Sequence, residues 1–167
     1  MKMTPREIEK YLDLLAGTLD HIAFITREAS EELLHHKATK QDWSVRDILA
    51  HLRACSDVWG NSIEAMLADE NPVLPDVHPR HRLKQTNYLD LRFRESLQAL
   101  ASQRAKMLSV LRQLPFEEWA RSAMIGERNH TVFSQVRRMA KHEAEHITQI
   151  AAMLQSSSDR AKMDSEV

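Results

Sequence analysis

Four long stretches of this sequence repeat apolar residues every three or four positions, and this periodicity constrains the fold more than any other feature. Residues spaced in this way share one face of an α-helix, so each stretch predicts a helix with one buried side. The stretches are residues 5–28, 45–67, 88–114 and 131–155. No alternating pattern predicts a β-strand. The sequence therefore predicts an all-α four-helix bundle, in which residues 1–155 form a single domain and residues 156–167 a polar tail that is expected to fray.

Two of the predicted helices begin at patterns that cap a helix N-terminus. Thr4 precedes Pro5, and Glu7 lies three positions after Thr4. A hydroxyl accepts from an exposed backbone amide, and proline suits the first helical position. Ser44 and Asp47 supply the same chemistry at the second helix, where the helix dipole favours the Asp47 carboxylate in the first turn.

The connector between the second and third helices is long for a helical bundle. Residues 69–86 contain three of the five prolines and almost no periodic apolar positions, so we expect an irregular segment. A connection of this length can cross the whole bundle, which allows the two helices that it joins to run parallel. Residues 115–130 are expected to be irregular as well, and residues 30–37 to form a short helical turn.

Composition and charge narrow the expected partners. The formal net charge is -1 and no long basic run occurs, which argues against a nucleic-acid-binding surface. The sequence has no apolar window of 18 residues and begins without the apolar core of a signal peptide, so we expect a cytoplasmic protein with no membrane partner. The single cysteine, Cys55, cannot form an internal disulfide, in agreement with a reducing compartment.

Residues 142–146 read His-Glu-Ala-Glu-His and lie within the predicted fourth helix. The spacing of four places His142 and His146 on one helix face, where both rings can bind one ion. Met139 and Gln149 share this face, which is the side of the helix that should be buried. The two imidazoles are therefore predicted to point into the bundle.

His51 lies on the corresponding inner face of the second helix, in line with Ile48 and Cys55. A buried imidazole without a partner costs free energy, and three in one core are costly unless something binds them. We therefore predict a divalent metal site formed by His51, His142 and His146, with positions left open for water or substrate. For each histidine taken alone, a hydrogen-bonded core residue is the alternative.

Residues beside the three predicted ligands are candidates for a substrate pocket. They are Asp47, Cys55, Trp59 and Gln149. Glu143, adjacent to the first ligand of the fourth helix, is the candidate for a general base, although it lies about 80° from the mean direction of the two histidines around the helix. Cys55 is read first as a small buried hydrophobe, with a fourth ligand or a reactive thiol as the alternative. His130 precedes the fourth helix and either overhangs the pocket mouth or lies on the surface.

The same five residues match H-E-x-x-H, the zinc-binding pattern of metalloproteases. In those enzymes the positions between the glutamate and the second histidine are uncharged, because that helix is buried on most sides. This chain has Glu145 there, and no substrate-binding edge strand is predicted. Peptidase activity is therefore not expected.

Several of these motifs together resemble the DinB-like (DinB/YfiT-like) metalloenzyme family. They are Trp43-Ser44 at a helix start, Ala50-His51-Leu52, Trp59, the Pro-rich connector, LPFEEWAR at residues 114–121 and HEAEHITQI at residues 142–150. The likeness covers about residues 5–155. Its most specific part is one histidine early in the second helix combined with H-x-x-x-H and I-x-Q-I near the end of the fourth.

The resemblance implies an up-down-down-up bundle, often dimeric, with a divalent ion held by residues that match His51, His142 and His146. Zinc and nickel are the usual ions of the family, and some members are transferases or isomerases that use a low-molecular-weight thiol. The chain is therefore expected to activate water or such a thiol for hydrolysis of, or S-transfer to, a small electrophilic molecule. The alternative is a non-catalytic metal-binding or stress-related dimeric bundle, whose core would be filled around the histidines.

Overall fold

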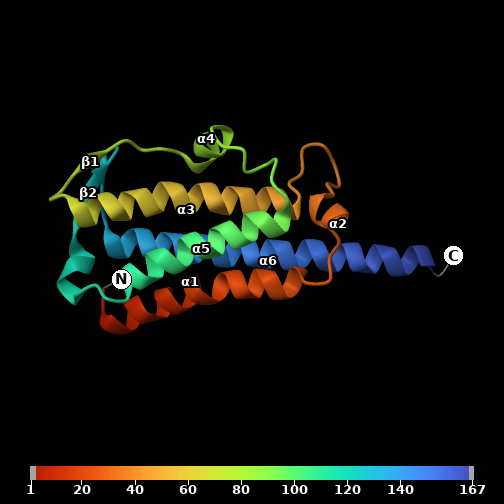
Figure 1. Ribbon diagram of the computed structural model, residues 1–167, viewed down its shortest axis with the longest axis horizontal. Helices are drawn as coiled ribbons and strands as arrows, with labels where there is room; N and C mark the ends of the chain where they lie inside the picture. Colours follow the sequence, from red (N-terminus) through yellow and green to blue (C-terminus); the bar gives the residue numbers. More distant parts are fainter. Residues whose placement is uncertain (1–2, 166–167) are drawn as a thin grey trace.

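The computed structural model describes residues 3–165, with side chains as far as residue 157. Four long helices account for most of it: α1 (Pro5–Thr26), α3 (Val45–Ala68), α5 (Phe93–Leu111) and α6 (Val132–Ser165) (Figure 1). Shorter elements are α2 (Glu31–His35), α4 (Pro79–Lys84), the 3-10 helix η1 (Phe116–Ala120) and the strands β1 (Val73–Leu74), β2 (Ser122–Ile125) and β3 (Arg128–Thr131). The prediction of a four-helix bundle is confirmed.

The four long helices run in pairs. In Figure 1, α1 and α6 run from left to right, whereas α3 and α5 run from right to left. Helices α5 and α6 each pack against both α1 and α3. The connector between α3 and α5 therefore joins two parallel helices and has to return along the bundle, which explains its length.

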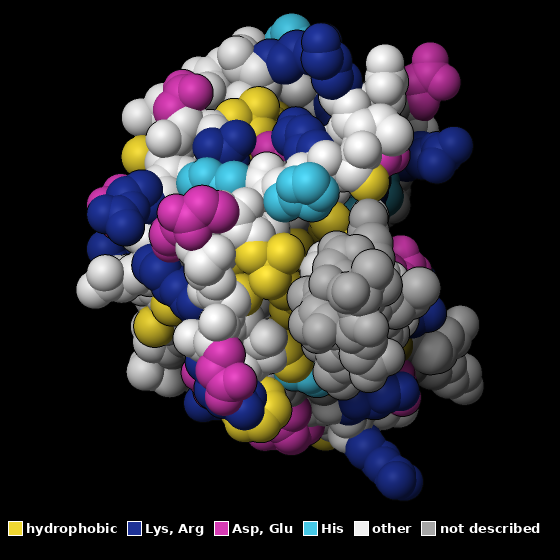
Figure 2. All heavy atoms as spheres, turned by 90° about the vertical axis from the view of Figure 1, so that its right-hand side faces the viewer, with side chains coloured by type: hydrophobic (Ala, Val, Ile, Leu, Met, Phe, Trp, Pro, Cys, Tyr) yellow, Lys and Arg dark blue, Asp and Glu magenta, His cyan; other side chains and the backbone are white. Residues whose placement is uncertain are grey.

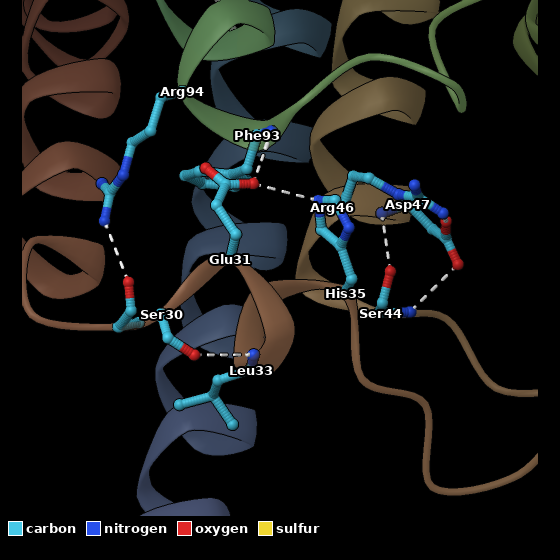
Figure 3. A network of polar contacts seen from close by, with 10 residues as sticks. Ser30, Glu31, Leu33, His35, Ser44, Arg46, Asp47, Phe93 and Arg94 are labelled. Carbon is cyan, nitrogen blue, oxygen red and sulfur yellow. Dashed lines mark hydrogen bonds and ion pairs between the residues drawn. The ribbon is translucent and has the colours of Figure 1, made fainter.

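The predicted caps of α1 and α3 are present. The Thr4 hydroxyl accepts from the Glu7 amide at 3.2 Å. At α3, the Ser44 hydroxyl accepts from the Asp47 amide and the Asp47 carboxylate accepts from the Ser44 amide, both at 3.1 Å, which forms a capping box (Figure 3). Figure 3 also shows the Glu31 carboxylate of α2 accepting from the Phe93 amide at the start of α5.

Replacing Ser44 by alanine should destabilise the protein by about 1 kcal/mol, because the first turn of α3 then loses a hydrogen-bond acceptor. Urea unfolding followed by circular dichroism measures this change. Ser109→Ala is the control, since that hydroxyl is exposed on α5 and binds only a carbonyl of its own helix. Equal unfolding midpoints for the two variants would contradict the stabilising role of the capping box.

The apolar core consists of two main clusters, one around Trp119 and one around Phe93. Charged and titratable side chains lie between them, and we call this set the polar layer: His51, Arg104, His142, Glu143 and His146. On α5, for example, Leu100 belongs to the Phe93 cluster and Leu108 to the Trp119 cluster, and Arg104 lies between these two positions. The predicted metal ligands thus occupy the middle of the bundle.

The prediction of no strands is wrong. Strands β2 and β3 form an antiparallel hairpin, and β1 pairs parallel to β2. The hairpin turns at Gly126, whose φ is 59° and whose missing Cβ leaves room for Asp76, because a Cβ there would meet the Asp76 Cβ at 3.1 Å. The strands have two to four residues, too few for an alternating pattern to stand out. The sheet covers one end of the Trp119 cluster and buries Ala123.

One additional helix and two helix boundaries also differ from the prediction. The connector contains α4, which begins at Pro79 and is held against α3 because Arg82 and Tyr88 both donate to Asp57, at 3.1 and 2.8 Å. Helix α5 begins at Phe93 rather than at residue 88. Helix α6 continues beyond residue 155 into the predicted tail and ends at Ser165.

Among the described helices, none combines the length and the apolar character that crossing a membrane requires.

Candidate metal centre

Three imidazole rings from two helices converge in the polar layer. His51 extends from α3, and His142 and His146 extend from successive turns of α6. The His142 Nε2 lies 3.1 Å from the His51 Nε2 and 3.2 Å from the His146 Nε2. One nitrogen from each ring lies within 4.8 Å of the other two. The structure therefore brings together all three histidines that the sequence singled out.

These distances fit coordination of one ion better than hydrogen bonding alone. Zinc–imidazole bonds of about 2.0–2.1 Å at tetrahedral angles separate neighbouring nitrogens by about 3.3 Å. In contrast, a neutral ring nitrogen carries either one lone pair or one proton, so the His142 Nε2 cannot form a full hydrogen bond with both neighbours. Imidazole nitrogens suit divalent transition-metal ions such as zinc, nickel, copper and iron.

Gln149 sets the tautomer of one of the three rings. The His146 Nδ1 lies 2.9 Å from the Gln149 Oε1, an oxygen that can only accept, so Nδ1 carries the proton. The Nε2 of His146 is then left with a free lone pair that faces His142. Gln149 was predicted as a pocket residue, and the structure places it beside the ligand, where it orients the ring.

Burial keeps two of the imidazoles neutral. His51 is 6% exposed, and burial, followed by the charges of His146 and His142, lowers its pKa to about 4. Burial and the neighbouring His146 also lower the pKa of His142. Neutral rings keep the lone pairs that metal binding requires at pH 7.

Two tryptophans pack against the three histidines. The Trp43 ring lies 5.0 Å from that of His51, edge to face, and stacks parallel to that of His146 at 6.5 Å between centroids. The Trp59 ring meets the His142 ring edge to face at 5.2 Å. Trp59 was a predicted pocket residue. Trp43 was not predicted as a site residue, although Trp43-Ser44 at the helix start was one of the motifs that carried the family resemblance.

A cavity of about 270 Å³ opens beside His51 and His142. Its other lining residues are Cys55, Trp59, His78, Pro79, Arg80 and Arg138. The prediction included Cys55 and Trp59, and it missed the others. Three of these residues belong to the connector, where no helical periodicity shows which side chains face the bundle. Arg138 is an exposed residue on α6, and its sequence position does not distinguish it from other solvent-exposed charges.

Cys55 is the buried thiol of this cavity. Its Sγ lies 3.4 Å from the His51 Nε2. Burial, together with the negative charge of Glu143, raises the pKa of Cys55 to about 12. Its surroundings thus hold this thiol in the neutral form, as expected of a small buried side chain.

Two predicted site residues face elsewhere. Asp47 belongs to the capping box and forms an ion pair with Lys37, so it does not line the cavity. Glu143 is 1% exposed, and both of its carboxylate oxygens accept from Arg104. The sequence could not show this partner, which lies on α5. The structure therefore uses the Glu143 carboxylate in an ion pair rather than as a base in the cavity.

His130 lies on β3 and lines an open groove of about 850 Å³ that also reaches His142. Burial lowers the pKa of His130. His130 thus lines this groove, and it is not among the described residues that line the cavity beside His51.

Comparisons with known proteins agree with this architecture. The solved structure of YfiT from Bacillus subtilis, described as a probable metal-dependent hydrolase with an unusual four-helix bundle topology, matches with a TM-score of 0.81. The match covers 94% of this chain and 91% of YfiT at 14% sequence identity, so it shows a shared fold. No curated protein matches the sequence. The model of the DinB superfamily matches residues 11–150, which is most of the chain, and the protein therefore belongs to the DinB superfamily.

Proposed function

We propose that this protein is a metal-dependent enzyme that catalyses the hydrolysis of, or the transfer of a low-molecular-weight thiol to, a small electrophilic molecule. One observation carries the proposal: the Nε2 atoms of His51, His142 and His146 converge beside a cavity of molecular size. A divalent ion held there, zinc or nickel, supplies a Lewis acid that polarises the reacting groups.

The described residues support this role in three ways. Three protein ligands leave at least one coordination position open, which is typical of catalytic rather than structural zinc sites. Gln149 fixes the ring of His146, and Trp43 and Trp59 exclude water from the sides of the site. The cavity gives a small substrate access to His51 and His142.

A non-catalytic bundle is the alternative that the sequence left open. It requires a core that is filled around the histidines, whereas a cavity of about 270 Å³ reaches His51 and His142 here. YfiT, which shares the fold, is described as a probable metal-dependent hydrolase. Both observations favour the enzyme.

The proposal is tested by assaying protein purified without a histidine tag. The metal-loaded protein should hydrolyse members of a panel of activated esters and amides, or consume a thiol in the presence of an electrophile. Chelation should abolish the activity, and zinc or nickel should restore it. A stoichiometrically loaded protein with no turnover on either panel would contradict the proposal.

Removing the metal should also lower the melting temperature. An ion bound only to the folded state stabilises it by about 2.7 kcal/mol at a free concentration 100 times the dissociation constant. For a chain of this length, that change corresponds to roughly 5–10 °C. Calorimetry before and after chelation measures it, and an unchanged midpoint in a fully loaded sample would exclude tight binding to the folded state.

A further inference from the structure

Two arginines line the same cavity as His51 and His142, each over a tryptophan that contacts a histidine. The Arg138 Cζ lies 4.9 Å from the Trp59 ring centroid, and the Arg80 Cζ lies 5.2 Å from that of Trp43. Arg138 belongs to α6 and Arg80 to α4, so the two guanidinium groups come from different parts of the chain.

Neither guanidinium is neutralised by a carboxylate. Among the described residues, Arg80 and Arg138 form no ion pair, whereas Arg82 pairs with Asp57 and Arg104 pairs with Glu143. Among the residues that the structure describes, no aspartate or glutamate lines the cavity. A guanidinium that packs on an aromatic face keeps the N–H donors at its edge free, and these donors match the paired oxygens of a carboxylate or phosphate.

The fold holds Arg80 at the cavity rather than leaving it on a free loop. Helix α4 is attached to α3 through the Arg82–Asp57 ion pair, and the Tyr88 hydroxyl donates to the same carboxylate. Pro79, the residue before Arg80, is buried and lines the cavity. These contacts orient the connector against the three histidines.

The positive charge is concentrated in the cavity. Two guanidinium groups line it, and a divalent ion bound by three neutral imidazoles would keep its full charge and add to theirs. The adjoining groove that reaches His142 shares Arg138 with the cavity and has a more balanced lining of four Lys or Arg side chains and three Asp or Glu side chains. Figure 2 views the right-hand end of Figure 1 and shows His side chains beside Lys, Arg, Asp and Glu side chains on that face.

We propose that Arg80 and Arg138 bind an anionic group of the substrate, a carboxylate or a phosphate, while the reacting part of the substrate faces His51, His142 and His146. This inference rests on the proposed function, since it names the class of substrate for the same site. The substrate is thus a small electrophile with an anionic end.

Calorimetric titration of the zinc-loaded protein with three unreactive probes tests the inference. Phenylphosphonate and benzoate carry an anionic group on an aromatic ring, and benzamide is their neutral counterpart. Both anions should bind at least about tenfold more tightly than benzamide, since one hydrogen bond between charged groups is enough for a factor of this size. Arg80→Gln and Arg138→Gln should each weaken anion binding by about tenfold and leave the zinc content unchanged.

Arg112→Gln is the matched control, because Arg112 is an exposed residue at the end of α5 and the variant loses the same single charge. A zinc-loaded protein that binds benzamide as tightly as benzoate would overturn the inference and leave the proposed function intact. The same holds if Arg80→Gln and Arg138→Gln behave like Arg112→Gln. A protein that takes up no zinc but still binds phenylphosphonate through both arginines would overturn the proposed function and leave the anion site intact.

Discussion

Replacing His142 by alanine should lower the affinity for zinc or nickel by more than about a hundredfold. Removing a residue that only orients a metal ligand lowers the affinity by up to about a hundredfold, and His142 is itself a proposed ligand. His142 is the ring to replace because its Nε2 lies within 3.2 Å of both other Nε2 atoms, so it belongs to any ion site that these rings share. The metal-dependent activity should fall with the metal content. Equilibrium dialysis against a competing chelator, followed by elemental analysis, measures the change.

A matched variant tests whether the loss of any histidine, rather than of this one, lowers the metal content. His21→Ala removes an exposed imidazole from α1 and should leave the metal content unchanged. His142→Gly, which leaves space for a free ring, should regain part of its metal binding when imidazole is added. If His142→Ala keeps a full complement of metal while its circular dichroism is native, the ion is not held by this site.

Replacing Arg104 by methionine should destabilise the protein by about 3–5 kcal/mol, the cost of leaving one charge of a buried pair without its partner. Arg104 is 2% exposed and Glu143 1%, and the guanidinium also donates to the Leu15 carbonyl at 3.2 Å. The variant therefore leaves the Glu143 carboxylate in the middle of the bundle with no cation beside it. Urea unfolding measures the loss of stability.

The double variant Arg104→Met with Glu143→Leu is the control for this prediction. Replacing both charges by apolar side chains removes the buried charge, so the double variant should be more stable than Arg104→Met alone. The ligands are untouched, and metal binding should persist in the double variant. A loss of less than about 1 kcal/mol in Arg104→Met would show that water or another group solvates the Glu143 carboxylate.

The helices and the three histidines could be predicted from the sequence because both depend on local spacing. Apolar residues at helical intervals define the buried faces, and Ser44 with Asp47 marks the start of α3 through contacts only three residues apart. His142 and His146 share a face for the same reason. His51 could be added because it lies on the buried face of its own helix.

Glu143 and Asp47 show where such reasoning ends. Helical spacing gave the direction of Glu143 relative to the histidines, but its partner Arg104 lies 39 positions away on α5, and no local pattern pairs them. Asp47 was predicted both as a cap and as a pocket residue, and only the cap is correct. The Asp47 carboxylate binds the Ser44 amide and Lys37, and it is not among the described residues that line the cavity.

The connector accounts for most of what the sequence could not predict. Helix α4 has six residues and β1 has two, which is too few for periodicity to indicate a face. The position of Arg80 depends on the contacts of Asp57 with Arg82 and Tyr88, which join segments 25 and 31 residues apart. The anion-binding part of the cavity is therefore visible only in three dimensions.

X-ray absorption spectroscopy at the metal edge of protein purified without a histidine tag tests the central claim most directly. The account predicts one zinc or nickel ion per chain and scattering from three imidazole rings, with metal–nitrogen distances of about 2.0–2.1 Å for zinc. The imidazole scattering should disappear or fall in His142→Ala. A chain that neither retains nor takes up a stoichiometric ion, or an ion whose ligands are not histidines, would contradict the account.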